Sequence, residues 1–346
     1  MSAEVFLKAC FNQPTEYTPV WFMRQAGRYL PEYRAIRSKL SLLEICRRPE
    51  VACEVTLQPV ERLGVDAAIL FADILLPFEP MGLGLSFRRG EGPVIERPIR
   101  KAEDVRRLRD LDPKSDLGYV METIRLVRHR LGERTPLIGF AGAPFTLASY
   151  AVEGGSTRSF VQTKTLMYSD PETWHALMDK LAVAVGRYLA CQIEAGAQAL
   201  QLFDSWAGAL SPDDYRRYAL PYTAKALALA RKANRNAPII HFGTGTSSLL
   251  ELMAEAGGEV IGIDWRIPLD QARSRLPGRA IQGNLDPCAL LGSVEELESQ
   301  VLAVLRRAGG QPGHIFNLGH GVLPQTDPDR LRRVVDLVHE RSAARV

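Results

Sequence analysis

Short apolar runs recur along the chain, and each is followed by a turn and then by a longer amphipathic stretch. The runs are four or five residues long and mostly apolar without clean alternation, a pattern typical of parallel strands covered on both faces. The eight runs are Val20–Met23, Ala67–Phe71, Leu137–Ala141, Ala199–Phe203, Ile239–Phe242, Val260–Asp264, Ala280–Gly283 and Ile315–Leu318.

The stretches between the runs carry helix boundary signals. Asp170-Pro171-Glu172 combines a capping residue, a proline at the first helical position and an acid in the first turn, and Gly196 marks the predicted end of that helix. The other predicted boundaries are Ser211-Pro212, with a bend at Pro221, a capping box of Ser293 and Glu296, whose helix ends at Gly309-Gly310, and Asp327-Pro328.

Eight strands that alternate with helices predict an α/β fold, a single (β/α)8 TIM-type barrel that occupies residues 1–346 as one domain. A doubly wound open sheet is the alternative, but no GxGxxG motif follows the first run. Residues 84–100 interrupt the rhythm and predict a β-hairpin inserted after strand two, with a glycine-containing turn at residues 89–92.

Composition and charge narrow the class of protein. The 346 residues are 46% hydrophobic and carry a net charge of only +3, so the chain lacks the basic field of a nucleic-acid-binding protein. No apolar run approaches the roughly 20 residues that a membrane span needs, and the first residues lack a signal-peptide pattern. The five cysteines form no CxxC pair, which favours a reducing compartment. We therefore expect a cytoplasmic protein without nucleic-acid or membrane partners.

Active sites of such barrels lie at the carboxyl ends of the strands. The polar side chains expected there include neither a lysine for a Schiff base nor a cysteine beside a histidine, and no histidine pair has zinc spacing. The combination suits a polyanionic ligand and charge stabilisation better than nucleophilic attack. The candidates after the runs are Arg24, Arg28, Asp73, Tyr150, Ser205 and His320.

Four motifs give these candidates a family context. Residues 19–34, PVWFMRQAGRYLPEYR, resemble the N-terminal signature of uroporphyrinogen decarboxylases, and residues 139–147, GFAGAPFTL, resemble the second signature of that family. Residues 201–208 and 317–321 match as well, so the resemblance covers essentially the whole chain in family order. Phe145 and Asp204 stand where other members also carry Trp and Glu.

The resemblance implies a barrel enzyme, usually a homodimer, that works without a metal or an organic cofactor. It would remove carbon dioxide from the four acetate arms of uroporphyrinogen III and release coproporphyrinogen III, a step of haem biosynthesis. It also implies roles for particular residues. Substrate would be bound by Arg24, Gln25, Ala26, Gly27, Arg28, Tyr150, Ser205 and His320, Asp73 would face the pyrrole nitrogens and stabilise the transition state, and Phe140 and Phe203 would form pocket walls.

These residue types suit that reaction. The sequence has no pyridoxal or thiamine motif, so a protonated pyrrole ring of the substrate would accept the electrons that departing carbon dioxide leaves behind. An ionised Asp73 would stabilise the resulting cation and accept hydrogen bonds from pyrrole N–H groups. Guanidinium groups bind carboxylate arms bidentately. The proton donor stays open between His320 and a water molecule held by Tyr150 or Arg28.

Other interpretations of the same residues remain. Arg24 and Arg28 are spaced like a solvated helix face, Asp73 like a helix cap, and His320 like a turn donor between glycines. Asp264 and Asp286 are interpreted as barrel-rim structure, and His241 as a hydrogen-bonded strand-end residue.

Two rival functions are a zinc methyltransferase of related fold and a non-catalytic tetrapyrrole carrier. The first would carry a His-x-Cys motif on the fifth strand, but this chain has Gly243 at the position of that cysteine. Loss of the acid at position 73 would have suggested the carrier, but Asp73 is present.

Overall fold

Seven parallel strands form the central sheet of the computed structural model, which describes residues 3–88 and 92–343. Every described strand residue of this sheet is buried except Phe203, which is half-buried. Burial on both faces explains why the runs show no alternation of apolar and polar residues. In sheet order the strands are β1 (Ala68–Ile69), β4 (Leu137–Gly142), β5 (Ala199–Asp204), β6 (Ile239–Gly243), β7 (Val260–Gly262), β8 (Ala280–Gln282) and β9 (His314–Ile315).

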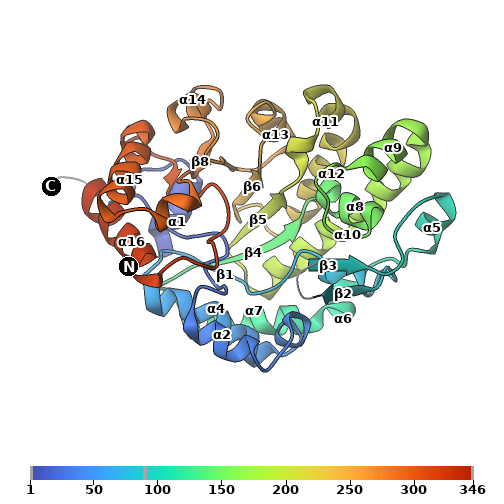
Figure 1. The fold of residues 1–346 in the computed structure, drawn as a ribbon, viewed down its shortest axis with the longest axis horizontal. Coiled ribbons are helices and arrows are strands. Elements are labelled where there is room, and N and C mark those ends of the chain that lie inside the picture. Colours follow the sequence, from blue (N-terminus) through green and yellow to red (C-terminus); the bar gives the residue numbers. More distant parts are fainter. Residues whose placement is uncertain (1–2, 89–91, 344–346) are drawn as a thin grey trace.

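Helices surround this sheet, with the strands at the centre of the molecule (Figure 1). They connect successive strands, as parallel pairing requires. The helices among the described residues are α1 (Ala3–Cys10), α2 (Pro31–Arg37), α3 (Leu42–Cys46), α4 (Pro49–Leu63), η1 (Leu76–Phe78), α5 (Ala102–Arg107), α6 (Pro113–Asp116), α7 (Gly118–Leu131), α8 (Pro144–Glu153), α9 (Val161–Ser169), α10 (Pro171–Ala195), η2 (Ala207–Ala209), α11 (Pro212–Tyr218), α12 (Leu220–Ala230), α13 (Leu250–Ala256), α14 (Leu269–Ser274), η3 (Pro287–Leu291), α15 (Val294–Ala308) and α16 (Pro328–Ser342). None of these helices is long and apolar enough to cross a membrane.

Two predicted helix boundaries are confirmed. The Asp170 side chain caps α10 by accepting a bond from the Thr173 N–H, and Gly196 follows its last residue. Asp327 caps α16 by accepting a bond from the Asp329 N–H. These caps satisfy backbone donors that the helix itself leaves unpaired.

Two other boundary predictions need correction. The helix expected to bend at Pro221 is divided at Ala219 into α11 and α12, because proline fits the first turn of a new helix better than a helix interior. Ser293 accepts a bond from the Glu296 N–H, as a capping box requires, but the Glu296 carboxylate accepts a bond from Gln300. α15 ends before Gly309, as predicted.

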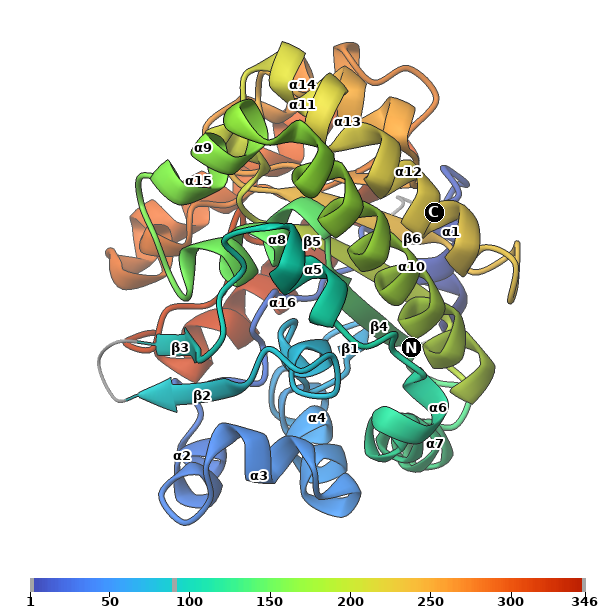
Figure 2. The same cartoon turned by 90° about the vertical axis from the view of Figure 1, so that its right-hand side faces the viewer.

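The predicted hairpin is present after β1, the second run. β2 (Leu85–Arg88) pairs antiparallel with β3 (Gly92–Ile95), and the register joins Leu85 to Ile95. Figure 2 shows this pair extending from the body of the molecule. The predicted turn at residues 89–92 lies outside the described residues except for Gly92.

The first run does not form the strand predicted over Val20–Met23. Only Val20 makes a parallel bridge, to Phe316, and its carbonyl accepts the Asp66 N–H at 2.8 Å. The Trp21 N–H donates to the Phe316 carbonyl at 3.3 Å, but the other three backbone donors of the run bond to side chains. The acceptors are Asp66 for the Val20 N–H, Gln25 for the Phe22 N–H and Asn317 for the Met23 N–H.

These bonds close the barrel. Val20 contacts Phe316 beyond β9 on one side and Asp66 ahead of β1 on the other, so the first and last parts of the sheet meet. The barrel prediction is therefore confirmed and the open-sheet alternative is wrong, with one of the eight strands reduced to a bridge. The division into one domain over residues 1–346 stays a prediction.

A polar chain crosses the barrel interior. The Trp21 indole N–H donates to the Gln282 amide oxygen at 2.9 Å, and the Gln282 amide donates to the Gln201 oxygen at 3.1 Å. All three side chains are buried. Because buried polar groups need partners, these hydrogen-bonded side chains fix the first run against β5 and β8.

The closure predicts the effect of a substitution at Asp66. Its buried carboxylate accepts bonds from the Val20 N–H and from His339, each at 2.7 Å, and from the Tyr17 hydroxyl at 3.1 Å. Asp66→Ala leaves a buried backbone donor unpaired, so we expect the free energy of unfolding to fall by about 3–5 kcal/mol. Denaturant unfolding measures the change.

Asp329→Ala is the matched control. Asp329 pairs with Arg62 at 3.2 Å on the surface, where its side chain is 74% exposed. Exposed pairs contribute roughly 0–1 kcal/mol, so this variant should unfold close to the parent. Equal stabilities for the two variants would contradict the closing role of Asp66.

Candidate active site

Four of the predicted site residues act on one another electrostatically at the carboxyl ends of the strands. Burial has the largest effect on the pKa of Asp73, Tyr150 and His320, raising the first two and lowering the third. The positive charge of Arg24 acts on all three and favours the deprotonated form of each. These residues follow the first run, β1, β4 and β9. Barrel closure therefore brings together side chains that lie almost 300 positions apart in sequence.

The backbone around Arg24 is held in an uncommon conformation. Arg24 has a φ of +60°, in the left-handed region that few non-glycine residues adopt. The preceding residue, Met23, is fixed by Asn317 and by Val322, whose N–H donates to the Met23 carbonyl. A Cβ atom at Gly321 would lie 2.3 Å from the Cδ atom of Arg24, so the arginine stem passes over that glycine. The surrounding structure thus determines the direction of this side chain.

Gln25 is engaged within the protein. Its buried side chain accepts the Phe22 N–H and donates to the Ala67 carbonyl, both at 3.0 Å, and its carbonyl accepts the Tyr29 hydroxyl. These bonds tie the first run to β1 and position Arg24 from the C-terminal side. Ala26 and Gly27 are half-buried beside it, and a Cβ atom at Gly27 would lie 2.9 Å from the Arg24 carbonyl oxygen. Direct contact of these three residues with substrate stays a prediction.

Asp73 is half-buried just beyond β1. Burial raises the pKa of its carboxyl group above the ordinary value, while a hydrogen bond from the Leu75 N–H and the charge of Arg24 oppose the rise. The bond to Leu75 uses one carboxylate oxygen, Oδ1, at 2.9 Å. This carboxylate is therefore partly desolvated and suited to stabilise a positive charge placed against it.

Aromatic side chains border the site on the α8 side. Tyr150 stacks on Trp206 with ring centroids 3.8 Å apart, and Phe160 meets the same indole edge-on at 5.2 Å. Burial and then the charge of Asp73 raise the pKa of Tyr150 to about 12, so its hydroxyl is protonated at neutral pH. Trp206 is not among the predicted site residues, although its position directly after Ser205 was the available signal.

His320 is half-buried after β9. Burial lowers the pKa of its imidazole, the charges of Arg24 and Arg266 lower it further, and Asp264 and a backbone hydrogen bond at Gly321 oppose the shift. The ring is therefore neutral at neutral pH and provides one hydrogen-bond donor and one acceptor. This protonation state is unsuited to a proton donor.

Phe140 of β4 and Phe203 of β5 meet edge to face, with centroids 5.5 Å apart and planes at 90°. Ser205 follows them, half-buried at the end of β5. The segment that carries Phe203 and Ser205 is held by Asp204, which accepts a bond from Thr146 at 3.1 Å, and Thr146 also accepts the Trp206 N–H.

Arg28 is exposed, as Arg24 is, but its positive charge acts on Tyr33 of α2. Its carbonyl accepts a bond from Arg34 at 3.0 Å. The role of Arg28 as a carboxylate ligand stays a prediction.

Asp264, Asp286 and His241, which were interpreted as structural residues, largely make structural hydrogen bonds. Asp264 accepts the N–H groups of Gly245 and Arg266, and Asp286 accepts that of Cys288, so both hold loops of the rim. His241 bonds the Met253 carbonyl through Nδ1, but its Nε2 atom lies 3.7 Å from the Asp204 carboxylate without a hydrogen bond. The expectation for His241 is therefore met at only one ring nitrogen.

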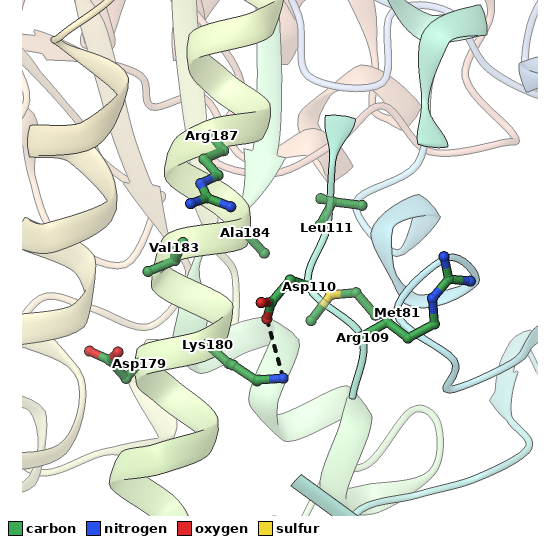
Figure 3. A pocket seen from close by; sticks show the side chains of 9 residues that line it. All are labelled: Met81, Arg109, Asp110, Leu111, Asp179, Lys180, Val183, Ala184 and Arg187. Atoms are coloured by element: carbon green, nitrogen blue, oxygen red, sulfur yellow. Dashed lines mark ion pairs between the residues drawn. The ribbon is translucent and has the colours of Figure 1, made fainter. Parts of the chain in front are cut away.

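Two pockets in the described part of the chain bear on the location of the site. One, of about 400 Å³, includes Ser205 and Trp206 in its lining and so borders the site. The other, of about 220 Å³, lies between α10 and residues 109–111 and is lined by none of the predicted site residues. Figure 3 shows this second pocket, with Lys180 paired to Asp110 at 3.3 Å. The first pocket and the neighbouring barrel mouth are therefore the candidate location of the chemistry.

No group of three or more His, Cys, Asp or Glu side chains that could hold a metal ion is found within residues 3–88 and 92–343. The residues gathered at the barrel mouth instead offer one carboxylate, guanidinium groups, a phenol and a neutral imidazole. Such a set can bind carboxylates and stabilise a cation between them.

Comparisons with known proteins find relatives that match nearly the whole chain. A relative named uroporphyrinogen decarboxylase from Sorangium cellulosum is 57% identical over 335 residues, which are 96% of this chain and 95% of the relative. Another of the same name, from Carboxydothermus hydrogenoformans, is 53% identical over 98% of this chain and 97% of the relative.

The fold also resembles a solved methyltransferase from Methanosarcina mazei. The TM-score is 0.79 at 20% identity, and 99% of each chain is covered, so this likeness bears on the fold alone. The family model described as uroporphyrinogen decarboxylase (URO-D) matches residues 1–341. The predicted family and its place in porphyrin biosynthesis are thereby confirmed, and this chain belongs to the uroporphyrinogen decarboxylase family.

Proposed function

We propose that this chain decarboxylates the four acetate arms of uroporphyrinogen III and so forms coproporphyrinogen III, with Asp73 as the group that stabilises the transition state. The observation that supports this most directly is the partly desolvated carboxylate of Asp73, set beside Arg24 at the barrel mouth. Whole-length similarity to relatives named uroporphyrinogen decarboxylase supports the same reaction.

The reaction needs three proton transfers for each arm, two that add a proton and one that removes it. A proton adds to the ring carbon next to the pyrrole carbon that carries the acetate, and the ring becomes cationic. The bond between the acetate methylene and its carboxylate then breaks, carbon dioxide leaves, and the electron pair neutralises the ring as an exocyclic double bond. Protonation of the exocyclic carbon gives a methyl group, and loss of the first proton restores the pyrrole. The sum is one proton consumed for each carbon dioxide released.

Asp73 acts on the cationic stage of this sequence. An ionised carboxylate interacts more strongly with the cationic ring than with the neutral one, so it lowers the barrier rather than merely binding substrate. Arg24 would hold a carboxylate arm, while its own charge favours the ionised form of Asp73. Because His320 is neutral, it would donate or accept a hydrogen bond, and water held near Tyr150 is the better proton source.

The remaining parts of the proposal concern assembly and environment. We expect a homodimer, as the family resemblance implies, in the cytoplasm, where the cysteines would stay reduced. We further expect activity without metal or organic cofactor. Sedimentation of the active protein and its activity after dialysis against a strong chelator test these two expectations.

An anaerobic assay tests the function itself. Uroporphyrinogen III is incubated with the protein, and chromatography follows the species with eight, seven, six, five and four carboxyl groups. Stepwise loss of the eight-carboxyl species with matching carbon dioxide release supports the proposal. Absence of carbon dioxide release by well-folded protein would favour the tetrapyrrole carrier.

Asp73→Asn keeps the side-chain shape but removes the charge and adds an N–H donor facing pyrrole donors. We predict that kcat falls by roughly 10²- to 10³-fold, the scale seen when one stabilising group is lost. Burial raises the pKa of Asp73 in the folded state, so its ionised form opposes folding, and this cost grows as the pH rises through that pKa. The variant should therefore be at least as stable as the parent at neutral pH. A folded Asn variant with near-parent kcat would remove Asp73 from the mechanism.

The raised pKa also predicts a pH profile. The carboxyl group of Asp73 takes up a proton at a higher pH than an ordinary Asp, whose pKa is about 3.9. Activity that needs the ionised form should therefore fall, as the pH is lowered, before an ordinary Asp would titrate. Measurement of kcat against pH, with thermal unfolding at each pH as control, checks this. An acid limb that persists unchanged in Asp73→Glu and Tyr150→Phe but is absent in the residual activity of Asp73→Asn would assign it to Asp73.

Arg24→Lys keeps the positive charge but loses the planar fork. We predict that KM rises by roughly 10-fold, since a charge-assisted bidentate contact is stronger than a single one by about 1–2 kcal/mol. Kinetics with uroporphyrinogen measure the change. Unchanged KM and kcat in this variant would contradict a role for Arg24 as a carboxylate ligand.

A further inference from the structure

A substrate with eight carboxylates needs more cations than Arg24 and Arg28 supply. The pocket of about 400 Å³ beside Ser205 provides three more, from Arg158 ahead of α9, Lys164 in α9 and Arg266 after β7. Its wall also contains Trp206, the indole on which Tyr150 stacks. This cationic pocket, as we call it, is therefore continuous with the candidate active site through Ser205 and Trp206.

Two of the three cations are uncompensated. Among the described residues, the charged groups of Arg158 and Lys164 have no ion-pair or hydrogen-bond partner, and Arg158 is exposed while Lys164 is half-buried. These two unpaired positive charges line one pocket, so an anion placed between them is favoured. The Thr244 hydroxyl in the same wall is buried and lacks a partner within the described residues, which leaves it free to donate to such an anion.

Arg266 differs because the protein itself fixes it. Its guanidinium pairs with the Asp264 carboxylate at 2.5 Å and lies over the Trp265 ring at 4.1 Å. Its charge also acts on His320, which connects this side of the pocket with the predicted site. Arg266 is thus a preorganised cation on the boundary between the cationic pocket and the barrel mouth.

We propose that the cationic pocket binds carboxylate arms of the tetrapyrrole that are not reacting, with Arg158 and Lys164 as their ligands. This inference rests on the proposed function, because it assigns a second contact region to the same substrate. Arms held there are fixed away from Asp73 while an acetate reacts beside it. Such contacts are made equally in the ground and transition states, so they act on KM rather than on kcat.

The test is an Arg158→Gln/Lys164→Gln double variant, assayed with the eight-carboxyl and the five-carboxyl porphyrinogens. We expect KM to rise about 10-fold, which corresponds to about 1.4 kcal/mol, with kcat within about 2-fold of the parent. The single variants are measured as well, and thermal unfolding confirms that each is folded.

Arg187→Gln is the matched control. Arg187 is another exposed arginine that lines a pocket, but its pocket, shown in Figure 3, is the one beside α10. This substitution removes one positive charge without touching the cationic pocket, so KM should stay at the parent value. A rise equal to that of Arg158→Gln would mean that net charge alone is responsible and would overturn the proposal.

The two substrates identify the arms. Propionates persist in every intermediate, so a propionate contact predicts the same relative rise in KM for both substrates. An acetate contact predicts a larger rise for the eight-carboxyl species. Unchanged KM for both substrates, in a parent that releases carbon dioxide normally, overturns the pocket and leaves the proposed function intact. A parent that releases no carbon dioxide refutes the proposed function instead, and the dissociation constants of the two porphyrinogens for parent and variant then decide the pocket.

Discussion

Closure of the barrel at Val20 is the constraint on which the rest of the structure depends. The first run lacks the ladder of a full strand, so the buried side chains of Asp66, Gln25 and Asn317 accept three of its four backbone donors. The residues held in this way directly precede Arg24, and Gln25 directly follows it. The bonds that close the barrel therefore also orient the Arg24 side chain, and a substitution that weakens these bonds also displaces the site.

The site itself depends on a balance between burial and charge. Burial raises the pKa of Asp73 and so favours the protonated form, which carries no charge to stabilise a cation. Arg24 and the Leu75 N–H oppose this, and Arg24 also helps to keep His320 neutral. One arginine thus favours the charged state of the carboxylate and the uncharged state of the imidazole. This division of protonation states is what acid–base chemistry at a single pH requires.

Sequence patterns predicted the barrel because parallel strands buried on both faces have a recognisable composition. They failed at the first run, since nothing in Val20–Met23 indicates that side chains from positions 25, 66 and 317 replace the ladder. The site residues could be named through motifs, but the stack of Tyr150 on Trp206 and the action of the Arg28 charge on Tyr33 depend on side-chain direction. Arg158, Lys164 and Arg266 lie outside every motif, and only the fold brings them to one pocket.

Repetition of the reaction explains why the site has two kinds of contacts. Four acetates must reach Asp73 in turn, so the reacting centre has to be rigid while the grip on the other arms has to accept different orientations of the ring. The fixed elements are those held by buried bonds, namely the backbone of Arg24 and the segment around Asp204. Arg158 and Lys164 are long, flexible and unpaired among the described residues, and such side chains can follow carboxylates that arrive in different positions. Rigidity is thus confined to the groups whose placement sets the barrier, since a small displacement there costs far more than at the periphery.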